Sequence, residues 1–215
     1  MERGEPPFDN IRLVPIGHNR IDRYSPSFTV RFLQHNPHAV VVTTSEVRAQ
    51  LKKNSSAFDQ IQARVVVPEL EWRQSAVREI DGIRLEIARL KHDDDKERAC
   101  ALYVFLFDLD GKRVLFAPAT TGFFPEEYET LGYSKRGIDL AFVNFHLMIR
   151  PGAGGVAAMN SAGTRQVRDL IGPQVPVMNH IRPERLPFVE EMLPDLREQL
   201  PTVTLFRQLL ETLTF

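Results

Sequence analysis

Two Asp-Gly pairs in the middle of the chain constrain its fold more than any other feature. The pair at 81–82 divides the segment 75–92 into two alternating apolar and polar runs, and the pair at 110–111 divides 100–118 in the same way. Asp-Gly between two such runs is a strong signal for a two-residue β-hairpin, because both turn residues must adopt a positive φ. The sequence therefore predicts an antiparallel meander at the centre of the fold.

Strand and helix patterns alternate on both sides of this meander. Ser25-Pro26 and Ser45 are expected to begin the first two helices. The predicted order is strand 11–16, helix 26–34, strand 38–44, helix 46–54 and strand 63–68 before the meander, and strand 139–145, helix 162–172, strand 174–180, a proline-interrupted helix 183–200 and strand 202–206 after it. The Gly-rich stretch 149–162 is expected to be an open loop over a site or a disordered flap. This order predicts an α/β fold with parallel neighbouring strands, mixed sheets and helices outside, in a single domain over 1–215 that begins with a polar extension at 1–10.

Composition excludes several classes of function. The net charge is −1, with Lys+Arg 27 against Asp+Glu 28, so the charge balance indicates neither nucleic acid nor an anionic membrane as partner. Cys100 is the single cysteine, so an internal disulfide and cysteine-based zinc are excluded, and its thiol is expected to be buried. No apolar run approaches the roughly 20 residues of a membrane span, and the N-terminus lacks the apolar segment of a signal peptide. A cytoplasmic protein is therefore expected.

Three of the six histidines follow or end predicted strands: His18, His92 and His180. The carboxyl ends of parallel strands meet at one edge of a sheet, where α/β proteins place their sites. We therefore expect these three side chains to lie in one cleft, although each residue by itself is also compatible with a structural loop histidine.

The other three histidines give weaker signals. His35 and His38 flank a turn between a predicted helix and a strand, and both are expected to be solvent-exposed. His146 follows a predicted strand and remains ambiguous. The prediction of a site at the strand ends does not depend on any of them.

The loop after the first strand, GHNRIDRY, has the spacing of a metal-binding loop without its full set of ligands. His18, Arg20, Asp22 and Arg23 stand at i, i+2, i+4 and i+5, and histidine at the two arginine positions would give H-x-H-x-D-H. Arginine cannot ligate zinc, because its guanidinium stays protonated and offers no acceptor. The residues alone leave open whether this is a metal site that has lost ligands or a basic loop.

The ordered motifs resemble the metallo-β-lactamase superfamily, in particular its broad branch of metal-dependent hydrolases of the ascorbate-6-phosphate lactonase type. The matching segments are LVPIGHNRIDRYSP, RLKH, DLDGKRVLFAPAT, GIDLAFVNF and VMNHIRPERL, which together cover about residues 9 to 185. The resemblance implies an αββα sandwich. The family begins with a strand hairpin before the metal loop, so we expect the N-terminal strands to be truncated here. An exposed sheet edge would then favour a homodimer.

Matched to the family's motifs, the metal ligands implied for this chain are His18, Asp22, His92 and His180, and Asp22 is also the candidate catalytic residue. The resemblance places the family's remaining ligands at three other positions. Arg20 and Arg23 stand where the other two loop histidines belong, and Ala119 stands where the bridging aspartate belongs. Neither metal would then keep the three protein ligands of an ordinary catalytic zinc site. We expect no dinuclear centre, and as cofactor either none or a single divalent ion, with zinc the first choice.

Three functions remain open at this point. In the first, the site is metal-independent, and Arg20 and Arg23 pair with Asp22 and either bind a small anionic ligand or only fill space. In the second, the three strand-end histidines hold one ion with Asp22 as ligand or general base, and the substrate is a lactone, an ester or a phosphodiester. In the third, the chain has no activity of its own.

Overall fold

The computed structural model describes residues 5–6, 8–20, 24–92, 101–117, 124–151 and 157–207 of the chain. Within these residues the strands are β1 Leu13–Ile16, β2 Val40–Thr43, β3 Val65–Val66, β4 Ser75–Ile80, β5 Ile83–Lys91, β6 Ala101–Leu109, β7 Lys112–Ala117, β8 Leu140–Asn144, β9 Ile149–Pro151, β10 Ala157–Met159, β11 Val175–Asn179 and β12 Thr204–Leu205. The α-helices are α1 Pro26–His35, α2 Ser45–Lys53, α3 Phe58–Ile61, α4 Pro125–Leu131, α5 Ser161–Gln166 and α6 Leu186–Gln199.

The N-terminal part forms the predicted β-α-β-α-β unit. Strands β1, β2 and β3 pair in this order, and all are parallel. Helix α1 begins as expected, because the Ser25 side chain accepts from the Phe28 N–H and proline occupies the first turn. The predicted cap of α2 was wrong by one residue. Thr44, not Ser45, is the N-cap, and its hydroxyl accepts from the Val47 N–H at 3.4 Å.

The central meander is confirmed at both hairpins. Asp81 and Gly82 have φ of 52° and 77°, and Asp110 and Gly111 have φ of 49° and 78°. These positive angles match the right-handed twist of the strands that the turns join. Strands β4 to β7 are antiparallel to one another in sequence order.

After the meander the strands become parallel again. The seven-stranded sheet has the order β12-β11-β8-β7-β6-β5-β4. Its first four strands, β12, β11, β8 and β7, are all parallel to one another. Because β6 is antiparallel to both β5 and β7, strands β5, β7, β8 and β11 all end at the same edge of this sheet. The structure therefore brings the ends of these four strands to one side of the molecule.

Two expectations for the C-terminal half were wrong. The stretch 149–162 is not wholly irregular, since β9 and β10 pair as an antiparallel hairpin, with 152–156 outside the described residues. Helix α6 is continuous although Pro194 lies inside it. The buried side chains of Val189, Leu193 and Leu196 hold α6 against the core, which offsets the hydrogen bond that proline cannot make.

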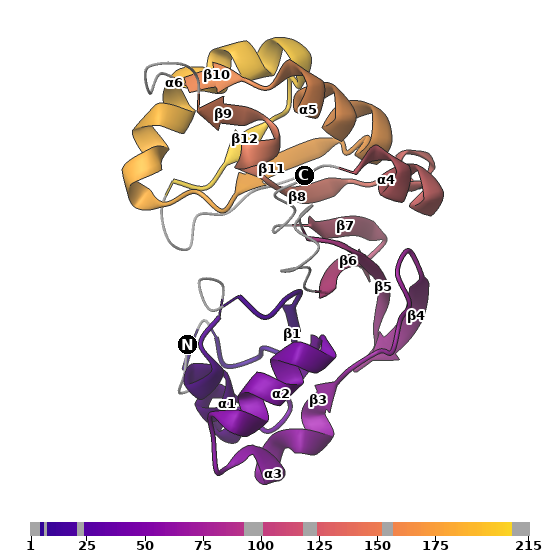
Figure 1. Cartoon of the computed structure of the whole chain (residues 1–215), viewed down its shortest axis with the longest axis vertical. Coiled ribbons are helices and arrows are strands. Elements are labelled where there is room, and N and C mark those ends of the chain that lie inside the picture. The colour runs from indigo at the N-terminus through magenta and orange to yellow at the C-terminus, as the bar shows by residue number, and fades with distance from the viewer. Residues whose placement is uncertain are drawn as a thin grey trace.

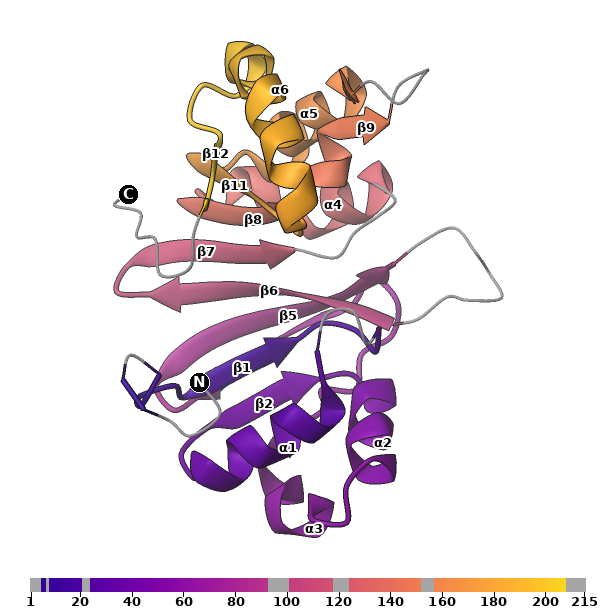
Figure 2. The same cartoon turned by 90° about the vertical axis from the view of Figure 1, so that its left-hand side faces the viewer.

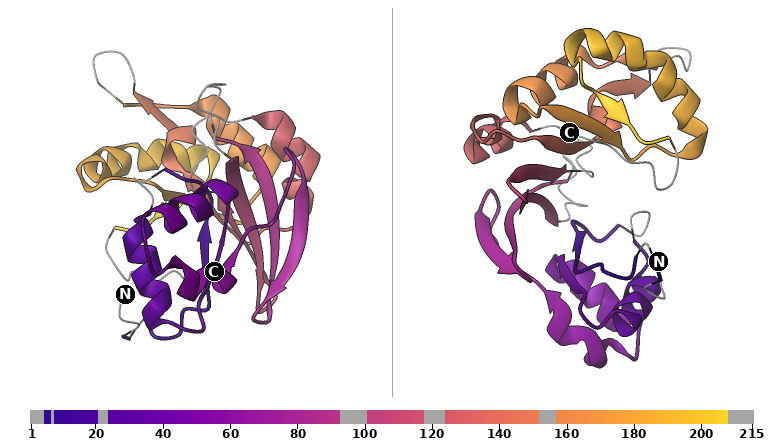
Figure 3. Two further views of the ribbon diagram at one scale, coloured as in Figure 1. Left: turned by 60° about the horizontal axis from the view of Figure 1, so that its bottom comes forward. Right: turned by 180° about the vertical axis from the view of Figure 1, so that it is seen from behind.

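The two sheets pack face to face between two layers of helices (Figure 1). Helices α1 to α3 lie on the outer face of the three-stranded sheet. Helices α4 to α6 lie on the outer face of the seven-stranded sheet (Figures 2 and 3). Buried Val42 and Leu70 meet buried Ile87 and Phe105 between the sheets. The predicted αββα arrangement is confirmed. No helix in the described part of the chain is long and apolar enough to cross a membrane.

Candidate functional site

A pair of buried histidines lies where β1 and β5 end. His18 is 3% exposed and His92 is 1% exposed, and their ring centroids are 4.9 Å apart with the rings at 81°. Gly17 makes this approach possible. Its carbonyl accepts from the Tyr103 N–H at 2.7 Å, and a Cβ at this position would lie 2.5 Å from the Tyr103 carbonyl oxygen. The absence of a side chain at Gly17 thus allows the end of β1 to approach β6 just before His18.

The end of β5 is held by Glu127, a residue of α4 that is 0% exposed. Its two carboxylate oxygens each accept from the Lys91 N–H at 3.2 Å, and Oε1 also accepts from the indole N–H of Trp72. Burial raises the pKa of Glu127, and these hydrogen bonds to its charged form oppose that rise. The carboxylate therefore fixes the backbone immediately before His92. No pattern in the sequence indicated Glu127, because its partners are 36 and 55 residues away.

Aromatic and cationic side chains cover this carboxylate. The Lys91 ammonium lies 4.8 Å from the ring centroid of Trp72 and 5.3 Å from that of Phe124. The guanidinium carbon of Arg73 lies 4.5 Å from the Trp72 ring. Cations at these distances are attracted to the faces of aromatic rings. These contacts hold Trp72, the single tryptophan of the chain, between two cations although it is 46% exposed.

A second pair of histidines lies where β8 and β11 end. The ring centroids of His146 and His180 are 5.9 Å apart, with the rings at 71°. His146 lies in the 3-10 turn Phe145–Leu147, directly after β8. His180 has φ of +67°, an unusual conformation for a residue with a side chain. His146 was ambiguous in the sequence. It follows a predicted strand, but only the pairing of β8 with β11 places it beside His180.

The structure pairs the histidines at the strand ends. It brings His18 and His92 together, whereas His180 pairs with His146. No group of three or more His, Cys, Asp or Glu that could hold a metal ion occurs in the described ranges. Asp22, Arg23 and Ala119, like Cys100, lie outside those ranges, and their predicted roles stay predictions.

Arg20 lies at the described end of the loop and is exposed. Its backbone N–H donates to His18 Nδ1 at 3.0 Å. A neutral imidazole that accepts at Nδ1 carries its proton on Nε2. In this arrangement, therefore, neither ring nitrogen of His18 offers a lone pair to a metal ion.

A zinc ion bound by two histidines fixes the distance between their rings. Two imidazoles on one tetrahedral zinc, with Zn–N near 2.0–2.1 Å, place their ring centroids about 5 Å apart. The 4.9 Å between His18 and His92 agrees with this spacing, but the hydrogen bond from Arg20 must break before His18 can ligate. A dinuclear centre needs further ligands, and no third His, Cys, Asp or Glu among the described residues joins this pair. The described residues alone do not make up a dinuclear centre.

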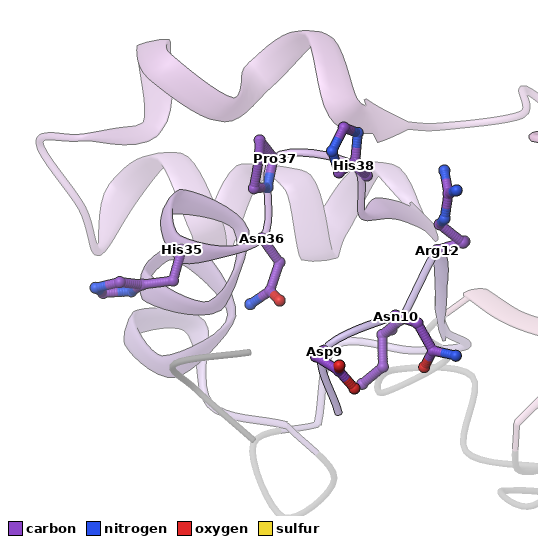
Figure 4. A pocket seen from close by; sticks show the side chains of 8 residues that line it. Asp9, Asn10, Arg12, His35, Asn36, Pro37 and His38 are labelled. Atoms are coloured by element: carbon purple, nitrogen blue, oxygen red, sulfur yellow. The ribbon is translucent and has the colours of Figure 1, made fainter. Parts of the chain in front are cut away.

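A separate cavity of about 240 Å³ lies at the other end of β1 and β2, where these strands begin (Figure 4). Asp9, Arg12 and His38 line it, and His35 points away from them in this view. His35 and His38 are both exposed, as predicted. The two histidine pairs lie at the opposite edge, so this cavity is not part of the candidate site.

Comparison with known families assigns the fold. The beta-lactamase superfamily domain matches residues 2–181, and the chain belongs to this family. The expected resemblance is thereby confirmed. No curated protein matches the chain.

Solved structures share this fold at low sequence identity. The chain is similar to Igni18, a metallo hydrolase from Ignicoccus hospitalis KIN4/I, with TM-score 0.58 and 16% identity over 92% of this chain and 78% of that one. It is also similar to Zn(2+)-bound PqqB from Methylobacterium extorquens, with TM-score 0.61 and 10% identity over 92% of this chain and 71% of that one. CmlA, a diiron beta-hydroxylase from Streptomyces venezuelae, gives TM-score 0.53 and 14% identity over 90% of this chain. The chain spans 43% of the length of CmlA.

Proposed function

We propose that this chain is a metallo-β-lactamase-fold protein with a degenerate metal-binding motif, without a dinuclear centre and with impaired hydrolytic activity. The observation that carries the proposal is the hydrogen bond from the Arg20 N–H to His18 Nδ1, at 3.0 Å. It occupies the lone pair of a predicted ligand, in the loop where arginine replaces histidine. Arg20 and Arg23 also add positive charge where a cation would have to bind.

A second candidate is a hydrolase with one metal ion. The separation of 4.9 Å between the buried rings of His18 and His92 favours it. The His18 ring would have to release Arg20, and Asp22 would be the third ligand or the general base. A divalent ion bound there would supply a water molecule of lowered pKa, and zinc is the first choice. Lactones, esters and phosphodiesters are the substrate classes to assay.

A role in binding a small anion is compatible with the first proposal. Arg20 is exposed, so its guanidinium can meet an anion from solvent, and Arg23 follows in the same loop. Guanidinium groups bind carboxylate and phosphate in a bidentate geometry. In this reading the protein is a binding or regulatory module rather than an enzyme.

Metal content decides between these candidates. The purified protein is dialysed with zinc, then without it, and the bound metal is measured by elemental analysis. We expect well below one equivalent for the parent, and a clear increase for the triple variant Arg20→His, Arg23→His and Ala119→Asp. Arg78→His with Arg84→His, at two exposed positions of the meander, controls for added histidine.

Two results would contradict the first proposal. Two tightly held equivalents in the parent would show an intact dinuclear centre. One equivalent that is lost in His92→Ala would instead support the hydrolase with a single ion.

A further inference from the structure

A cavity of about 320 Å³ opens where β8 and β11 end. It is lined by Phe145, His146, His180, Arg182, Glu184 and Arg185. Its volume falls within the range of pockets that hold small molecules. The lining combines two arginines and two imidazoles with one carboxylate, so the cavity favours a negatively charged ligand.

The arginines of this cavity are not neutralised by the described protein. Arg185 forms no ion pair with any residue in the described ranges. Arg182 approaches Glu184 at 3.9 Å, with side chains 74% and 64% exposed. An ion pair this long and this exposed contributes little. Both guanidinium groups therefore keep donors for a ligand.

The inner wall of the cavity is held in place by its neighbours. The His146 ring packs on buried Phe145 with centroids 4.0 Å apart, and the His146 N–H donates to Asn144 Oδ1 at 3.0 Å. His180 is fixed in its left-handed conformation at φ +67°. Residues held in such sparsely populated conformations are concentrated at functional sites.

Two buried polar atoms lie beside this wall without a hydrogen-bond partner: Asn144 Nδ2 and Asn179 Oδ1. The two asparagines face each other in the register of β8 and β11, each just ahead of the histidine turn of its strand. Asn144 is 0% exposed. A buried donor and a buried acceptor left unsatisfied in a native fold call for an explanation, and an ordered water or a ligand group at the strand ends supplies one.

We propose that this cavity binds a small molecule that carries a phosphate group. Arg182 and Arg185 bind the phosphate oxygens, and the imidazoles of His146 and His180 contact the ligand from the inner wall. Phosphate suits the cavity better than a single carboxylate, because its additional oxygens can satisfy donors from both arginines. This inference is independent of the metal content of the His18 and His92 pair.

The test is isothermal titration with inorganic phosphate and with phenyl phosphate at constant ionic strength, in chloride buffer. Both should bind saturably to the parent protein, and phenyl phosphate should bind at least as tightly as inorganic phosphate, because the cavity has room for an organic group. Arg185→Ala should weaken both affinities by about tenfold or more, as expected for the loss of a charged hydrogen bond. Arg185→Lys should restore part of the loss.

Matched variants locate the site. Arg78→Ala removes an exposed arginine from β4, at the other end of the seven-stranded sheet, and should leave both affinities unchanged. Unchanged affinities in Arg185→Ala, an equal loss in Arg78→Ala, binding of inorganic phosphate alone, or no saturable binding to the parent would each overturn the proposal. Metal content, measured in parallel, tests the proposed function separately.

Discussion

At the scale of single residues, the buried carboxylate of Glu127 shows how one side chain can fix a strand end. Its hydrogen bonds connect α4 to the Lys91 N–H of β5 and to the indole of Trp72. Both hydrogen bonds are partly buried, so each donor would be costly to leave unpaired. Glu127 thereby fixes the backbone that carries His92, without being close to it in sequence.

Burial raises the pKa of Glu127 in the folded state, and this makes its contribution to stability depend on pH. In the unfolded chain the carboxyl titrates near its ordinary value of about 4.3. Between the unfolded and the folded pKa the folded protein binds more protons, so the stabilisation present below the unfolded pKa is lost as pH rises through the folded pKa. Glutamine does not titrate, so Glu127→Gln should not show this loss. We expect the unfolding free energy of the variant, relative to that of the parent, to increase from about pH 4 upward.

The measurement is urea unfolding followed by Trp72 fluorescence at a series of pH values. The control is Glu126→Gln, which changes the exposed neighbour on the same helix. A difference between parent and Glu127→Gln that stays constant with pH would contradict the assigned role of burial.

At the scale of secondary-structure elements, the approach of β1 to β6 depends on Gly17. Its missing side chain leaves space for the Tyr103 carbonyl, which would be 2.5 Å from a Cβ. We expect Gly17→Ala to separate the two strands locally and to destabilise the fold by about 1–3 kcal/mol, as overpacking does. The same shift should move His18 away from His92.

Denaturant titration gives the stability of this variant, and NMR spectra of the histidine rings report the geometry of the pair. Gly82→Ala provides a comparison, because a Cβ there meets nothing within 4 Å and only the positive φ of +77° is unfavourable. It should cost about 1 kcal/mol and leave the ring signals of His18 and His92 unchanged. Unchanged ring signals in Gly17→Ala would show that this contact does not position the pair.

At the scale of the whole molecule, the two sheets are joined by one apolar layer. Phe105 is 0% exposed and packs in the same cluster as Val42 of the three-stranded sheet. We expect Phe105→Ala to destabilise the protein by about 3–5 kcal/mol, through lost burial and the cavity left behind. Because the layer is shared, far-UV circular dichroism and Trp72 fluorescence should still report one coincident unfolding transition.

Val77→Ala is the surface control, since Val77 is 44% exposed on β4. It should change the unfolding free energy by no more than about 0.5 kcal/mol. Two separate transitions in Phe105→Ala would indicate that the sheets unfold independently and that the shared layer does not couple them.

Features governed by neighbouring residues were determined by the sequence itself. The hairpins followed from Asp-Gly, the start of α1 from Ser25 and Pro26, and the end of the helical segment before β11 from Gly172, which has φ of +63°. The alternation of strands and helices also indicated the parallel unit, and the ordered motifs indicated the family resemblance. Turn geometry and apolar periodicity act over a few residues, so they can be read without knowledge of distant contacts.

Only the tertiary structure decided which side chains meet. The register of β8 with β11 places His146 beside His180, and the contact between Gly17 and Tyr103 brings His18 to His92. The role of Glu127 and the continuity of α6 through Pro194 likewise depend on packing between distant segments. Burial and hydrogen bonding between segments far apart in the chain override local preference, because their free energies exceed the small differences between local conformations.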